Sequence, residues 1–149
     1  MKSLVAYYSR SSITKKLAEN IASKINADIE EIIPKVNYQG KIGYARGGKD
    51  AISEKIIELE KLKYNPADYD AVYVGGPVWA GKAANPVISY LKLNEGNFKN
   101  IKFFLTAGSS GFENSFRQME KYSIKPSKTL QLTTKEVKKD DYNLDSFLE

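Results

Sequence analysis

The chain has 149 residues, 42% of them hydrophobic, and its 23 basic and 18 acidic side chains give a net charge of +5. That length predicts one domain, residues 1–149, with room for a single core. The sequence contains no cysteine and no histidine, which excludes a disulfide framework, a thiolate nucleophile, a Ser-His-Asp triad and metal sites built from thiolate or imidazole.

Residues 1–33 predict a strand, a helix and a second strand. Residues 4–8 form a continuous apolar run, as in a strand buried on both faces of a parallel sheet. Apolar residues then recur every fourth position, which predicts an amphipathic helix packed on that sheet: Ile13, Leu17, Ile21 and Ile25. Residues 27–33 are typical of a strand but carry several acids, so we expect this strand at or near an edge.

Residues 34–49 show no periodicity and contain four glycines, so we expect a long loop. Four basic side chains and two tyrosines lie between residues 35 and 49 without any acid. Because no nucleic-acid motif accompanies this charge, we interpret the segment as a solvated, mobile loop near an anionic cofactor and predict no nucleic-acid partner. A helix over residues 50–59 follows, with Ile52, Ile56 and Leu59 on one stripe.

The second half of the chain continues the alternation of strands and helices. Residues 71–76 and 101–107 predict strands, and residues 129–133 predict a last strand at the other edge. Asn85-Pro86 is typical of a helix start. Apolar residues indicate two further helices, one at Phe112, Phe116 and Met119 and a short final one at Leu144, Phe147 and Leu148.

This alternation predicts an α/β fold with a doubly wound five-stranded parallel sheet, strand order 2-1-3-4-5 and helices on both faces. In that order the first, third and fourth strands are neighbours, so the loops after them meet on one rim. Ligands of such sheets bind beyond the carboxyl ends of the strands, where the winding direction reverses.

No stretch of the chain reaches the roughly 18 apolar residues of a membrane span. The apolar run after Lys2 is too short for a signal peptide. We therefore expect a cytoplasmic protein without a membrane partner.

The loop after the first strand has the composition of an anion site. Residues 9–14 read Ser-Arg-Ser-Ser-Ile-Thr and bring hydroxyls and free backbone N–H groups to the start of a helix. The helix dipole and these N–H groups favour a negative charge, and a phosphate monoester fits best.

The loops after the third and fourth strands suit a flat ring. Residues 74–81 read Val-Gly-Gly-Pro-Val-Trp-Ala-Gly, and residues 105–111 read Leu-Thr-Ala-Gly-Ser-Ser-Gly. Trp79 offers an aromatic surface, and the small residues let backbone groups approach the polar edge of a ligand. Together the three loops predict a site for a ring with a phosphate handle.

These strings resemble the flavodoxin-like family of FMN proteins, and more narrowly its short single-domain members from bacteria and archaea. The resemblance spans almost the whole chain, and its most specific part is Gly-Pro-Val-Trp-Ala-Gly at residues 76–81. It implies a flavodoxin-like fold and noncovalent FMN. In a chain without histidine or cysteine, that cofactor is where redox reactivity would lie.

By this resemblance, the cofactor-binding residues come from all three loops. The phosphate would be held by the hydroxyls of Ser9, Ser11 and Thr14 and by the backbone N–H groups of Arg10, Ser12 and Ile13. The isoalloxazine would be bordered by Pro77, Val78, Trp79, Ala80 and Gly81, with Trp79 stacked on the ring. The second flavin-facing loop would contribute Ala107, Gly108, Ser109 and Gly111. No catalytic residue and no metal ligand is implied.

One departure from the family pattern lies in the phosphate loop, where Ser12-Ile13 replaces the usual Gly-Asn. If that glycine has a positive φ, a serine there costs on the order of 1 kcal/mol and weakens phosphate binding, unless its extra hydroxyl compensates.

The resemblance implies a redox protein that exchanges electrons with a partner protein, and the basic segment 35–49 would steer an acidic partner. The alternative is an FMN-dependent NAD(P)H:quinone-type oxidoreductase that acts on a nicotinamide or a quinone. A third interpretation is a flavin-free binding or regulatory module on the same fold. A monomer and a homodimer are both compatible with the sequence.

Overall fold

The computed structural model describes residues 1–149. Its elements in chain order are β1 (Ser3–Tyr7), α1 (Ile13–Ile25), β2 (Asp28–Glu31), α2 (Gly40–Ile52), the 3-10 helix η1 (Pro66–Asp68), β3 (Ala71–Trp79), β4 (Lys82–Ala83), α3 (Asn85–Leu93), β5 (Ile101–Ala107), α4 (Phe112–Lys121), β6 (Lys128–Thr133), α5 (Thr134–Lys138) and α6 (Asp145–Leu148). No helix has the length and apolar character that a membrane span requires.

The sheet follows the order β2-β1-β3-β5-β6, and each neighbouring pair on this path is parallel. Counted in chain order without β4, these strands run 2-1-3-4-5, so the predicted order is confirmed. The sheet has six strands rather than five, because β3 continues past Gly76 and folds back onto β4. The reversal takes place at Ala80 and Gly81, whose φ angles of 49° and 78° suit a tight hairpin.

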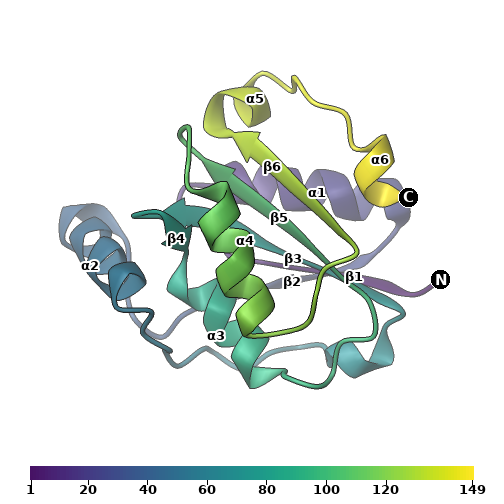
Figure 1. Cartoon of the computed structure of the whole chain (residues 1–149), viewed down its shortest axis with the longest axis horizontal. Helices are drawn as coiled ribbons and strands as arrows, with labels where there is room; N and C mark the ends of the chain where they lie inside the picture. The colour runs from purple at the N-terminus through teal and green to yellow at the C-terminus, as the bar shows by residue number, and fades with distance from the viewer.

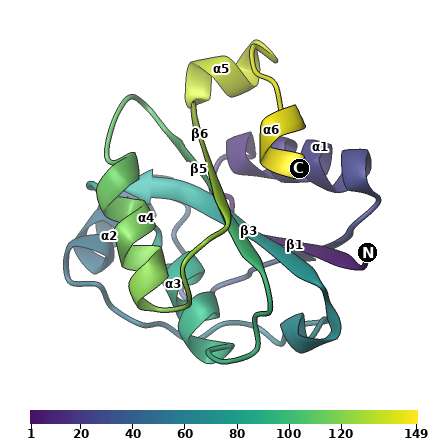
Figure 2. The same cartoon turned by 45° about the vertical axis from the view of Figure 1, so that its right-hand side comes forward.

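Helices cover both faces of this sheet. Figure 1 shows α3 and α4 in front of the strands and α1 behind them, and Figure 2 shows α6 on the same side as α1. The side chains of β1 alternate between the two resulting cores: Leu4 and Ala6 join the core under α3 and α4, while Val5 and Tyr7 join the core under α1. The continuous apolar run therefore has the burial on both faces that we predicted.

Two predictions for the segment between β2 and β3 were wrong. Residues 40–52 form α2 where we predicted a loop through residue 49, and the helix predicted over residues 50–59 is already complete at Ile52. The buried stripe of α2 consists of small or polar residues, which give no hydropathy signal: Gly43, Gly47, Asp50 and Ala51. The isoleucines that suggested the later helix are exposed, Ile52 by 66% and Ile56 by 41%.

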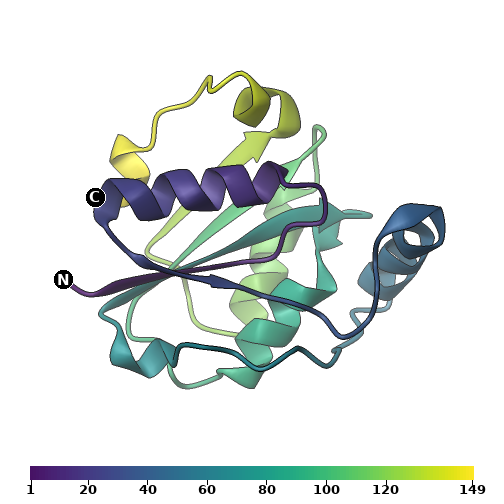
Figure 3. The same cartoon turned by 180° about the vertical axis from the view of Figure 1, so that it is seen from behind.

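The position of α2 matters for the site. The view from behind in Figure 3 agrees with Figure 1 that α2 stands beyond the ends of the strands and does not cover either face of the sheet. The strand β2 that leads to it spans only Asp28–Glu31, shorter than the predicted 27–33. The helix α2 therefore lies at the rim from which the loops after β1 and β3 emerge.

Candidate functional site

The loops after β1, β3 and β5 leave the same edge of the sheet, since these three strands are parallel neighbours. The second and third loops touch at Gly111, where a Cβ atom would lie 2.8 Å from Val78 Cγ1 and 3.1 Å from Gly81 Cα. Gly111 also has a φ of 92°. Only glycine allows this contact at this conformation, so the structure brings together the loops that the sequence predicted to meet.

The loop after β1 presents unpartnered hydrogen-bonding groups. The hydroxyl oxygen of Ser9 is buried and has no partner. The backbone N–H of Lys16 donates to Ser12 C=O at 3.0 Å, so the N–H groups ahead of it in α1 are the free ones of a helix start. No acidic side chain occupies the first turn. An anion such as a phosphate fits this combination of a buried hydroxyl, free N–H groups and a positive helix end.

Ser12, which replaces the glycine usual in the family, has a positive φ. Its φ of 68° and ψ of −3° lie in the left-handed region, and its side chain makes no capping hydrogen bond. The condition for a conformational cost at this position is therefore met, and that cost is about 1 kcal/mol or somewhat more for a residue with a Cβ atom.

Thr14 is placed differently from the other hydroxyls of this loop. It is only 2% exposed, and its Oγ1 lies 2.8 Å from Thr106 Oγ1 in a hydrogen bond that joins α1 to β5. Ser11 and Ser12 are exposed on the loop surface. The Thr14 hydroxyl thus connects the start of α1 to β5, while the hydroxyls of Ser11 and Ser12 face the surface.

A cleft of about 290 Å³ lies between α2 and the end of β3, at the lower end of the range for small-molecule sites. Four of its lining residues belong to the predicted loops: Arg10, Val78, Trp79 and Ala80. The other four come from α2, within the segment that we predicted as a loop, and were not among the predicted site residues: Gly43, Tyr44, Gly47 and Gly48. Gly43 and Gly47 are four positions apart, as residues on one face of a helix are. This spacing was the only sign of the helix, and it does not stand out in a segment rich in glycine.

Trp79 is held by its neighbours from several directions. Its ring centroid lies 5.5 Å from that of Tyr8 and 5.0 Å from that of Tyr38, both in edge-to-face geometry. A Cβ atom at Gly47 would lie 3.0 Å from Trp79 Cζ3, so the backbone of α2 packs directly on the indole. The structure therefore fixes the orientation of the aromatic wall.

The two tyrosines beside Trp79 remain protonated at neutral pH. Burial raises the pKa of Tyr8 to about 12. Burial also raises the pKa of Tyr38, and the hydrogen bond that its hydroxyl donates to Asp50 Oδ2 at 2.7 Å raises it further. The surroundings of the indole therefore carry no phenolate charge.

Arg10 points toward α2. Its Nε donates to Tyr38 C=O at 2.8 Å and its Nη2 to Gly40 C=O at 3.0 Å. The guanidinium carbon also lies 5.3 Å from the centroid of the Tyr44 ring. Arg10 thus connects the serine loop to the start of α2.

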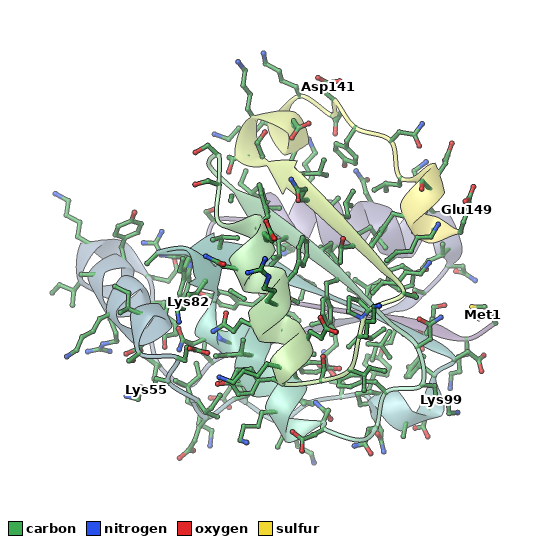
Figure 4. All side chains as sticks on the ribbon, viewed as in Figure 1. Met1, Lys55, Lys82, Lys99, Asp141 and Glu149 are labelled. Carbon is green, nitrogen blue, oxygen red and sulfur yellow. The ribbon has the colours of Figure 1, made fainter.

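A second cavity, of about 430 Å³, adjoins the turn at Ala80 and Gly81. Lys82 lies between α2 and α4 in Figure 4, and its Nζ donates to Glu54 Oε2 at 2.8 Å. This hydrogen bond is the main cause that lowers the pKa of Glu54, and Gln118 donates to the same carboxylate at 3.2 Å. The charge of Lys82 is therefore paired with a carboxylate just after α2, and Gln118 connects that carboxylate to α4.

The third predicted loop contributes less to the cleft than the first two. Ala107 is buried at the end of β5, whereas Gly108 and Ser109 are exposed. None of these residues lines the cleft beside Trp79. The loop reaches the site only through the contact of Gly111 with Val78 and Gly81.

The fold and this rim define a doubly wound α/β protein with a hydroxyl-rich loop and an aromatic cleft at the ends of adjacent strands. Residues 2–143 match the family model described as Flavodoxin, and the chain belongs to that family. A comparison with curated proteins finds no match.

Solved structures with the same fold include three informative examples. A flavoprotein from Lactobacillus acidophilus NCFM in complex with FMN is 23% identical with a TM-score of 0.76, over 93% of this chain and 97% of that one. A candidate flavoprotein from Bacteroides uniformis ATCC 8492 is 23% identical with a TM-score of 0.77, over 93% and 96%. An NADH:FMN oxidoreductase in its apo form is 14% identical with a TM-score of 0.56, over 99% and 84%. At such identities the similarity establishes the fold alone.

Proposed function

We propose that this chain binds FMN noncovalently at the rim and exchanges electrons with partner proteins. The observation that carries the proposal is the buried, unpartnered hydroxyl of Ser9 in the loop between β1 and α1. The strand β1 is the neighbour of β3, which carries Trp79. When bound, FMN supplies one- and two-electron redox chemistry. The protein residues bind and orient it.

The phosphate of FMN would lie at the serine loop. The hydroxyls of Ser9 and Ser11 and the backbone N–H groups of Arg10, Ser12 and Ile13 would hold it, and the positive end of α1 would stabilise its charge. A hydrogen bond to a charged group contributes about 1.5–3 kcal/mol. Thr14 would support this loop through its bond to Thr106.

The ring of FMN would occupy the cleft beside the indole. Trp79 would cover one apolar surface, and the turn formed by Val78, Ala80 and Gly81 would border the ring edge. Pro77 would set the direction of this turn, and Gly108, Ser109 and Gly111 would bound the site on the β5 side. These contacts exclude water from part of the ring.

The exposed face of α2 would be the surface that binds an acidic partner protein. Lys41 and Arg46 are exposed there, together with Ile42 at 81% and Tyr44 at 70% exposure. Exposed apolar side chains among unpaired positive charges favour a protein surface rich in carboxylates, because opposite charges steer the two molecules together.

Titration of flavin fluorescence tests the proposed cofactor. Adding the protein to FMN should quench the fluorescence to saturation at one FMN per chain, since the ring would contact the indole. Riboflavin should bind more weakly, because it lacks the phosphate. Absence of saturable quenching with FMN would overturn the proposal.

Anaerobic mixing with NADH or NADPH separates a carrier from an NAD(P)H:quinone-type oxidoreductase. Four residues of α2 line the cleft, so this helix would cover a ring bound there, and we expect no bleaching of bound FMN over minutes. Rapid stoichiometric bleaching would instead establish the oxidoreductase.

A further inference from the structure

The helix α2 has little intrinsic stability. Four of the residues in Gly40–Ile52 are glycines, the weakest helix formers apart from proline. Gln39, at its N-cap, makes no capping hydrogen bond through its side chain. Contacts with the rest of the protein must therefore hold this helix in place.

The inner face of α2 forms one wall of the cleft. Its Gly47 backbone packs on the Trp79 ring, and the Tyr38 side chain just ahead of the helix packs against the same ring. The hydroxyl of Tyr38 in turn bonds to Asp50 near the end of α2. The shape of the ring-binding cleft therefore depends on where α2 lies.

Arg10 makes the contacts that fasten the beginning of this helix to the serine loop. Its two donors reach the carbonyls of Tyr38 and Gly40, on either side of Gln39. Gln39 Nε2 returns a hydrogen bond to Arg10 C=O at 3.2 Å. A planar guanidinium holds its donors in a fixed fork and stacks on Tyr44, whereas a lysine ammonium is a compact charge on a flexible stem and has no flat face to stack.

We infer that Arg10 is a positioning residue that holds α2 against Trp79, so that the ring-binding cleft is assembled before a ligand enters. Its guanidinium donors serve backbone carbonyls and leave the phosphate to Ser9 and the N–H groups of α1. The effect of Arg10 on flavin affinity rests on the proposed function. Its effect on the position of α2 in the ligand-free protein rests only on the contacts described above.

The state of the cleft can be measured without any ligand, because Trp79 is the only tryptophan. In Arg10→Ala, we expect the emission of Trp79 to shift to longer wavelength and its quenching by acrylamide to rise several-fold. Lys24→Ala removes a positive charge of the same size from an exposed position on α1, away from α2, and should leave both values unchanged. Far-UV circular dichroism verifies that each variant is folded.

Affinities for FMN and riboflavin show which part of the ligand Arg10 affects. We expect Arg10→Ala to weaken both by a similar factor, about tenfold, so that the preference for FMN over riboflavin stays constant. Arg10→Lys should resemble Arg10→Ala, because lysine keeps the charge but loses the rigid fork that spans the two carbonyls and the flat face that stacks on Tyr44.

Each other outcome contradicts the inference. Loss of FMN affinity with unchanged riboflavin affinity, rescued by Arg10→Lys, would assign Arg10 to the phosphate. Unchanged Trp79 emission and quenching in Arg10→Ala would show that α2 does not need this residue. If the wild-type protein binds no flavin, the proposed function fails, but the Trp79 measurement still decides the role of Arg10.

Discussion

The hydroxyl of Ser9 is buried without a partner, and such a group costs a folded protein about 1–3 kcal/mol. Ser9→Ala should therefore raise the free energy of unfolding of the apo protein by about 1 kcal/mol and weaken FMN binding about tenfold. Riboflavin affinity should not change. Chemical denaturation and flavin titration measure these effects.

Ser23→Ala is the control for this substitution, because Ser23 is exposed on α1, the helix that follows the loop of Ser9. It should change neither stability nor affinity. A Ser9→Ala protein that is less stable than wild type, or that loses riboflavin as strongly as FMN, would contradict the assignment of Ser9 to the phosphate.

The conformation of Ser12 leads to a second prediction. A left-handed φ of 68° costs about 1–2 kcal/mol in a residue with a Cβ atom, whereas glycine adopts it freely. Ser12→Gly should therefore increase the free energy of unfolding by about 1 kcal/mol. Ser11→Gly, at a neighbouring exposed position without a positive φ, should give no increase in urea denaturation. Equal effects of the two substitutions would show that Ser12 is not strained.

Two adjacent glycines on α2 allow a matched test at the level of the element. A Cβ atom at Gly48 would meet nothing within 4 Å, so Gly48→Ala should stabilise the protein by up to about 1 kcal/mol through helix propensity. A Cβ atom at Gly47 would lie 3.0 Å from Trp79, so Gly47→Ala should displace the indole and lose that gain. Trp79 fluorescence and thermal unfolding report both. Identical behaviour of the two variants would mean that α2 does not pack on the indole.

Predictability from the sequence differed between elements for a physical reason. The strands β1, β3 and β5 and the helix α1 bury apolar side chains at regular spacing, and that spacing is visible in the chain itself. The contact face of α2 is mainly glycine and alanine, so its packing leaves no hydropathy pattern. The short α5 was also missed, although Thr133 and Glu136 form the capping box that starts it.

The charge of the whole molecule leads to a prediction for electron exchange. With a net charge of +5 and exposed cations on α2, the FMN-loaded reduced protein should react faster with ferricyanide, an anion, at low salt than at high salt. Hexaammineruthenium(III), a cation, should show the opposite or no dependence. Stopped-flow oxidation at several ionic strengths measures both rates.

Charge reversal separates the local contribution of α2 from the net charge. Lys41→Glu with Arg46→Glu should lower the low-salt rate with ferricyanide. Lys138→Glu with Lys139→Glu, at exposed positions around the end of α5, changes the net charge equally and should have a smaller effect. Equal effects of the two pairs would argue against a docking face on α2.

The sequence by itself determined the strand order, the burial of the sheet on both faces and the rim where the three loops meet, because these follow from local periodicity and from the geometry of parallel sheets. Only the tertiary structure decided that α2 closes the cleft, that Arg10 bonds to the start of this helix and that the Thr14 hydroxyl bonds to Thr106 on β5. These contacts join residues 28 to 92 positions apart. They depend on shape and on backbone groups, which no pattern of residue types along the chain records.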